Sequence, residues 1–170
     1  MNCLACELNA HPDLVPGGRI ATVGGWVVEH CVGPLGVGTV VVKPERHVTQ
    51  LSALNATEAM EIGPLLARVA GAVAEARADA GEPSDQVYCC LWSHAERRPG
   101  HIHFVVQPIS ARLVARFNAN GPDLQARMFK LDEKPEAEAA ASAADEIRRH
   151  LSIAPRSERD RGSSIFGIPE

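Results

Sequence analysis

Residues 101–107 carry the clearest hydrophobic pattern in the chain, because polar and apolar positions nearly alternate there. Successive side chains of an extended strand point to opposite faces, so His101, His103, Val105 and Gln107 would share one face. The three residues between them are apolar and would form the opposite, buried face. The bland interpretation is a half-buried strand with polar residues facing water. Two histidines spaced in this way are also a common device for metal binding or catalysis.

Other stretches predict further strands and several helices. Apolar runs bounded by glycine or proline indicate strands at 39–43 and 86–92, and a hairpin at 20–30. A long helix is expected from Asn55 to about residue 80, because Asn55 and Glu58 have the sequence of a capping box; Pro64 should kink or restart it. Shorter helices are predicted at 111–117, 123–131 and 136–151, before a charged, turn-rich tail from residue 154.

The composition is that of an ordinary globular protein. The 170 residues have a mass of 18.2 kDa, which suits one domain with a substantial core and an appendage. A net charge of −4 gives no sign of a nucleic-acid or membrane-surface partner. No apolar run approaches the roughly 20 residues that cross a bilayer. The first residues lack the basic start and apolar core of a secretion signal, so we expect a cytoplasmic protein.

Cysteine and histidine supply the candidate chemistry. There are five cysteines, and this odd number in a chain without a secretion signal favours free or metal-bound thiols over a disulfide framework. Cys3 and Cys6 form a Cys-x-x-Cys pair that can bind one Zn²⁺; a redox pair and chance are the alternatives. His47 follows a predicted strand directly, where it is either a surface loop residue or a further metal ligand.

The order of these features resembles the histidine-triad (HIT) superfamily of nucleotide hydrolases and transferases, in its zinc-containing branch. The resemblance is carried by Cys3-x-x-Cys6, Lys43-Pro-Glu-Arg-His47, the capped helix after Asn55 and His101-Ile-His103-Phe-Val-Val-Gln-Pro108. It implies an α+β fold over residues 1–110, with an antiparallel sheet of about five strands and a long helix packed on it. Residues 111–153 would be a C-terminal helical extension and 154–170 a flexible tail. Family members are commonly dimers, so a homodimer is expected.

The resemblance also implies roles for individual residues. Cys3, Cys6, His47 and His101 would bind a structural Zn²⁺, because a closed Cys₂His₂ set leaves no position for substrate. His103 matches the family's nucleophile. Its imidazole would attack the α-phosphorus of a nucleotide and form a covalent nucleotidyl-histidine, which water or another acceptor then resolves.

Four polar residues are candidate substrate contacts. Ser93, His94 and Arg98 belong to a polar loop predicted just before the histidine strand, where Arg98 would offer its charge to a phosphate. Gln107 lies on the same strand face as His103. The expected partner is therefore a small phosphorylated molecule, most simply a nucleotide.

Val105 is the main departure from the family pattern, which usually has a histidine or glutamine two residues after the nucleophile. Valine donates no hydrogen bond, and loss of one such donor typically costs on the order of 3 kcal/mol of transition-state stabilisation. The acidic residue that many members use to bind ribose is missing from its usual position, and Glu29 is the candidate replacement. The sequence favours an enzyme, a HIT-type hydrolase or nucleotidyl transferase. The alternative is a zinc-stabilised protein with a non-nucleotide substrate or a non-catalytic binding role.

Overall fold

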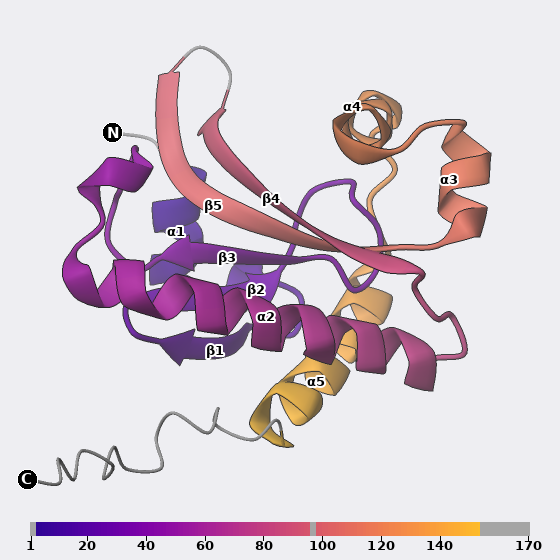
Figure 1. The fold of residues 1–170 in the computed structure, drawn as a ribbon, viewed down its shortest axis with the longest axis horizontal. Coiled ribbons are helices and arrows are strands. Elements are labelled where there is room, and N and C mark those ends of the chain that lie inside the picture. The colour runs from indigo at the N-terminus through magenta and orange to yellow at the C-terminus, as the bar shows by residue number, and fades with distance from the viewer. Residues whose placement is uncertain (1–2, 96–97, 154–170) are drawn as a thin grey trace, which may run out of the picture.

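The centre of the molecule is a five-stranded antiparallel sheet with the strand order β1-β2-β3-β5-β4 (Figure 1). The structure, a computed structural model, describes residues 3–95 and 98–153, apart from the side chains of residues 94, 95, 98, 99 and 153. The strands are β1 (Arg19–Val23), β2 (Trp26–His30), β3 (Val40–Pro44), β4 (Gln86–Ala95) and β5 (Arg98–Ile109). The predicted α+β fold is confirmed. The tail expected after residue 154 lies outside the described residues.

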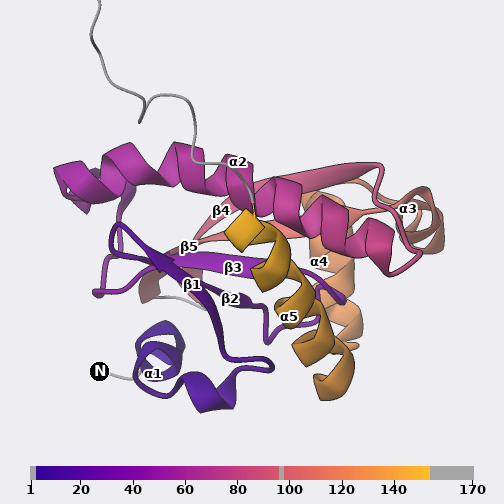
Figure 2. The same cartoon turned by 90° about the horizontal axis from the view of Figure 1, so that it is seen from below.

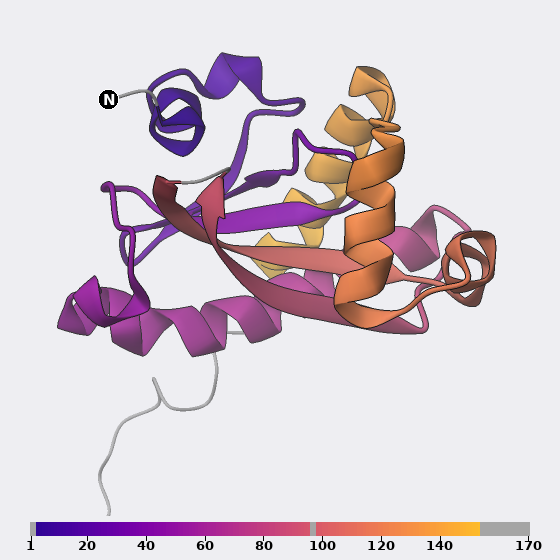
Figure 3. The ribbon, with the colours of Figure 1, turned by 90° about the horizontal axis from the view of Figure 1, so that it is seen from above.

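Helices cover both faces of this sheet. They are α1 (Leu4–Ala10), α2 (Ala56–Asp79), α3 (Ala111–Phe117), α4 (Gly121–Leu131) and α5 (Ala137–Ile153). Figures 2 and 3 show α2 on one face and α1 on the other. The main core lies between α2, α5 and the sheet, and includes Val106 of β5 and Ile147 of α5. No described helix is long and apolar enough to span a membrane.

The long helix α2 begins where its sequence predicts. Asn55 Oδ1 accepts a hydrogen bond from the Glu58 amide at 2.9 Å, and Glu58 Oε2 accepts one from the Asn55 amide at 2.8 Å, which completes the capping box. The helix then runs without interruption through Pro64, so the expected restart is wrong. Proline removes the hydrogen bond to the carbonyl of Met60, and this residue is 70% exposed, so water can bind that carbonyl instead.

A second, smaller core lies on the sheet face opposite α2. Val105 and Ile109 of β5 pack there with Leu124 and Met128 of α4. One half of β5 is thus covered by helices on both faces. His101 and His103 lie on this same face in the other half of β5, near α1.

Strands β4 and β5 form a hairpin that extends beyond the rest of the sheet (Figure 1). β3 pairs with β5 only from Val40 opposite Val106 to Val42 opposite Phe104, whereas β4 follows β5 along most of its length. The polar loop predicted at residues 93–98 is wrong for residues 93–95 and 98, because β4 continues to Ala95 and β5 begins at Arg98; residues 96–97 lie outside the described part of the chain. Each strand supplies the backbone partners of the other, so polar side chains there need no apolar face to form strand.

Candidate functional site

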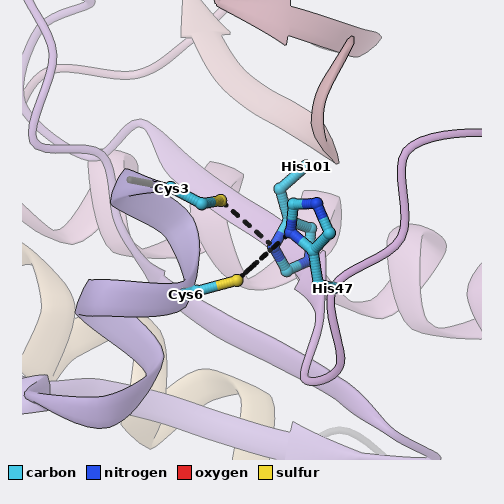
Figure 4. Close-up of side chains that lie close together, drawn as sticks. All are labelled: Cys3, Cys6, His47 and His101. Atoms are coloured by element: carbon cyan, nitrogen blue, oxygen red, sulfur yellow. Dashed lines mark hydrogen bonds between the residues drawn. The ribbon is translucent and has the colours of Figure 1, made fainter. Parts of the chain in front are cut away.

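Four side chains from three separate segments meet where β3 ends beside β5, as Figure 4 shows. They are Cys3 and Cys6 at the start of α1, His47 just after β3, and His101 in β5, and one ligand atom of each lies within 4.8 Å of those of the others. Cys6 Sγ is 3.3 Å from His47 Nδ1 and 3.6 Å from His101 Nδ1. Cys3 Sγ is 3.9 Å from His101 Nδ1. The sequence contains these residues but does not show that they converge.

The spacing of these atoms fits a tetrahedral zinc ion. Bonds of about 2.3 Å to sulfur and about 2.05 Å to nitrogen give ligand–ligand separations of about 3.3–3.8 Å in a tetrahedron. The sulfur–nitrogen distances of 3.3, 3.6 and 3.9 Å lie close to that range. Two thiols and two imidazoles are also the ligand types that zinc prefers. The four residues are therefore compatible with zinc.

The hydrogen bonds of His101 leave the correct ring atom free for a metal. Its Nε2 lies 2.9 Å from the carbonyl oxygen of Pro44, which only accepts, so Nε2 carries the proton and Nδ1 presents its lone pair to the cysteines. Burial lowers the pKa of His101 to about 4, so the ring stays neutral at physiological pH. Burial and the neighbouring Cys3 raise the pKa of Cys6, so a metal that binds there would displace a proton.

Local contacts hold each ligand segment in place. The amide of Ile102 donates to the carbonyl of Val48 at 2.8 Å, which fixes the loop after His47 against β5. Arg46 binds both carboxylate oxygens of Glu58, at 2.8 and 2.6 Å, and so ties the same loop to the first turn of α2. On the other side, Asn9 Nδ2 donates to the carbonyl of Glu45 at 2.9 Å and attaches α1 to the end of β3.

His103 lies two residues beyond His101 on the same face of β5. Its Nδ1 is 3.1 Å from the carbonyl oxygen of His101, and this oxygen again only accepts, so Nδ1 carries the proton. The lone pair is then on Nε2. Burial lowers the pKa of His103, while the hydrogen bond to His101 opposes that shift. The ring is therefore neutral near pH 7, with one nitrogen available as a nucleophile or base.

A buried ion pair that we did not predict lies beside His103. Val42 pairs with Phe104, so Lys43 and His103 follow as neighbours on the same face. Lys43 Nζ is 2.5 Å from Glu29 Oε1 and donates to the carbonyl of Ala5 in α1 at 3.1 Å. Glu29 is only 2% exposed and its Oε2 has no partner among the described residues. Glu29 is thus committed to Lys43 and buried, so the candidate replacement for the ribose-binding acid is not open to a ligand.

Helix α4 covers Val105, which lies two residues after His103. Val105 is buried in the second core against Leu124 and Met128, so no polar group acts from that position. Gln107 is fully buried as well. Its amide nitrogen donates to the carbonyl of Leu35 at 2.9 Å and its oxygen accepts from Gln125 at 3.0 Å. These bonds use the side chain of Gln107 inside the protein, and it has no exposed surface to offer a substrate.

The remaining expected substrate contacts lie in the hairpin. Ser93 is an exposed residue of β4, next to Trp92, which pairs with His103. His94 and Arg98 lie in β4 and β5, but their side chains are outside the part that the structure describes.

Two other features of the described residues are weaker candidates for a functional site. A cavity of about 400 Å³ opens at the far end of the sheet, lined by residues such as Arg77, Ser84 and Arg112, and none of the expected site residues lines it. Asp79, Glu146 and His150 also come together on the surface. Arg149 already binds both of these carboxylates, and their exposure makes a further cation unnecessary.

Comparison of the whole fold with solved structures identifies its class. A zinc-bound histidine triad family protein from Mycobacterium smegmatis superposes with a TM-score of 0.57 at 18% identity, covering 89% of this chain and 94% of that one. The chain has the histidine-triad fold. A histidine triad nucleotide-binding protein from Sulfolobus tokodaii matches with a TM-score of 0.61 at 16% identity, covering 97% and 100% of the two chains.

The HIT fold also occurs within a larger enzyme. A uridylyltransferase superposes with a TM-score of 0.61 at 19% identity over 91% of this chain, which spans 46% of that enzyme. No protein-family model and no curated protein matches the sequence. The likeness to HIT proteins is therefore one of fold, and the expected HIT architecture is confirmed at that level.

Proposed function

We propose that this chain is a HIT-type hydrolase or nucleotidyl transferase that cleaves a nucleotide phosphoester, phosphoanhydride or phosphoramidate through His103. The observation that carries the proposal is the orientation of His103. The carbonyl of His101 holds its Nδ1–H at 3.1 Å, so a neutral ring directs Nε2 away from the strand. HIT neighbours that include a nucleotide-binding protein and a uridylyltransferase support a nucleotide as partner.

In the proposed reaction His103 Nε2 donates its electron pair to phosphorus. The bond from phosphorus to the leaving oxygen breaks, and that oxygen keeps the bonding pair. The result is a nucleotidyl-histidine in which Nδ1–H still donates to the His101 carbonyl. A water molecule or an acceptor hydroxyl then attacks phosphorus, loses its proton to solvent and returns the electron pair to Nε2.

Val105 restricts which substrates suit this route. It provides no proton for the departing oxygen, so leaving groups that are stable as anions, such as a phosphate, should react faster than those that need protonation. Phosphoanhydrides are therefore better candidates than alkyl phosphoesters.

The same proposal assigns a structural zinc to Cys3, Cys6, His47 and His101. A closed set of four protein ligands supplies folding energy rather than an open catalytic position. A reducing environment keeps the thiol ligands from forming disulfides, which agrees with the proposed cytoplasmic location.

A homodimer is also part of the proposal. β4 is a ten-residue strand at the edge of the sheet, and Cys89 and Leu91 along it are exposed. Long edge strands with exposed apolar residues favour pairing with a second chain. Light scattering should give the mass of two chains, and Leu91→Lys should shift the protein to monomer.

The test of the chemistry is covalent labelling. Protein incubated with a dinucleoside polyphosphate and quenched in base should gain the mass of one nucleotidyl group, at His103, and should release mononucleotide on longer incubation. His103→Ala should show neither, while His150→Ala on the distant helix α5 should show both. Unchanged turnover in His103→Ala would exclude this mechanism.

A second function is favoured by one observation, the burial of Val105 under α4. A protein without a donor at that position is suited to bind a phosphorylated ligand without turning it over. Tight mononucleotide binding by calorimetry with no labelling of His103 would identify this function.

A further inference from the structure

The two sides of His103 across the sheet are filled differently. Toward β3 and β2 the neighbouring side chains are Lys43, Glu29 and Val27, which are 1%, 2% and 0% exposed. Lys43 also donates to the carbonyl of Ala5, so α1 covers this side of His103. An organic group attached to a phosphorus at His103 has no accessible surface to contact there.

Toward β4 the surroundings are aromatic and open. Trp92 pairs directly with His103 across β4 and β5, so the two side chains lie on the same face. The ring of Phe129, from α4, lies 5.3 Å from the Trp92 ring at 45°. Phe129 is 42% exposed and Trp92 is only partly buried, so both rings keep surface that a ligand can cover.

Three elements fix this aromatic pair in place. Trp92 comes from β4 and Phe129 from α4. The third element is the loop after β2, where Gly33 lies so near Phe129 that a Cβ atom added to it would be 3.6 Å from the ring. α4 is itself held against the sheet by Leu124 and Met128, which pack on Val105. The exposed ring of Phe129 is therefore carried by a helix that is packed against the sheet.

We propose that Trp92 and Phe129 form a subsite that stacks on the planar heterocycle of the substrate while its phosphorus is at His103. This inference rests on the proposed function, which places phosphorus at His103. Stacking reads the π-face that every nucleobase has, so the subsite accepts purine and pyrimidine nucleotides alike. It also explains Val105. This residue supports α4 by apolar contact, and it stands at the position where the family usually has a polar residue.

The protein reports occupancy of this subsite by its own fluorescence. The chain has two tryptophans, and Trp26 is fully buried in the main core, so a change on ligand binding comes from Trp92. The zinc-loaded full chain is titrated with adenosine monophosphate and with ribose 5-phosphate, which lacks the base. We expect the nucleotide to change the emission of Trp92 and to bind about tenfold more tightly than the sugar phosphate.

Variants separate stacking from a general effect. Phe129→Ala should weaken adenosine monophosphate about tenfold and leave ribose 5-phosphate unchanged, and Phe129→Tyr, which keeps the ring, should restore the affinity. Leu131→Ala is the matched control, since this residue of the same helix is 48% exposed. Equal weakening of both ligands by Phe129→Ala would overturn the inference. So would a nucleotide that binds no better than the sugar phosphate, or that leaves the emission unchanged.

Labelling of His103 keeps this result distinct from the proposed chemistry. If His103 is labelled but Phe129→Ala has no base-dependent effect, the subsite is wrong and the chemistry remains. If Phe129→Ala shows the base-dependent loss but His103 is never labelled, the subsite is supported and the chemistry is wrong.

Discussion

Replacing Lys43 with methionine should destabilise the protein strongly, because it leaves the carboxylate of Glu29 buried without its partner. The two side chains are 1% and 2% exposed, and their charged atoms lie 2.5 Å apart. With an effective dielectric constant of about 20, unit charges at this distance attract by roughly 7 kcal/mol. Removing both charges from water costs several kcal/mol each, so the net value of the pair is near zero. Loss of one partner alone should cost about 3–5 kcal/mol.

The decisive comparison is with the double variant Lys43→Met/Glu29→Leu. Apolar side chains of similar size fill the same space and carry no buried charge, so its free energy of unfolding should lie within about 1–2 kcal/mol of the wild type. Urea unfolding of the zinc-loaded protein, followed by circular dichroism, measures all four members of the cycle. Arg116→Met is the control, because Arg116 and Glu133 form an exposed ion pair whose loss should cost less than about 1 kcal/mol.

The pH dependence gives an independent check of the cause. Burial already raises the pKa of Glu29 against the opposing effect of Lys43, and without Lys43 it should rise further. A carboxyl whose pKa is higher in the folded than in the unfolded state takes up a proton on folding, so Lys43→Met should regain stability as the pH falls from 8 to 5. The reasoning is refuted if the single losses simply add in the double variant, or if the defect of Lys43→Met does not change with pH.

Three further predictions concern other parts of the fold. Cys6→Ser should abolish stoichiometric zinc, measured by atomic emission, and lower the melting temperature; an unchanged zinc content would remove Cys6 from the ligand set. His30 is fully buried, donates to the Cys31 carbonyl and accepts from the Gly38 amide, and burial lowers its pKa, so the unfolding free energy should fall as the pH drops below about 6.5. His30→Leu should flatten that slope in the same titration and cost about 1–3 kcal/mol through the unpaired Gly38 amide. Asn55→Ala should cost about 1 kcal/mol in urea unfolding through loss of the cap, with zinc content unchanged.

The elements with a strong local signal were predictable from the sequence. The capping box at Asn55 and Glu58 is a local pattern, and it forms as written. The alternation in residues 101–107 likewise placed His101 and His103 on one face, because the period of two follows from strand geometry. The prediction failed at residues 93–95 and 98, where pairing between the two backbones of the β4–β5 hairpin, and not hydrophobic patterning, determines the strand.

The meeting of distant residues was not predictable from local patterns. The alternation of β3 does place Lys43 on the face opposite Val42, which was a usable signal for its position beside His103. Its pairing with Glu29 depends on the register of β2 against β3, which the sequence does not show. The contact of Trp92 with Phe129 depends on where α4 docks, and the 3.6-residue period of that helix says nothing about its partner.

The carbonyl that orients His103 belongs to His101, whose own side chain is one of the four candidate zinc ligands. In a preparation where some molecules have lost the metal bound to His101, those chains would be folded but would hold His103 Nε2 in no fixed direction. Such chains would add to the protein concentration measured by absorbance but would not turn over substrate. Under the proposed mechanism, specific activity should therefore follow metal content linearly across batches, while the Michaelis constant stays the same.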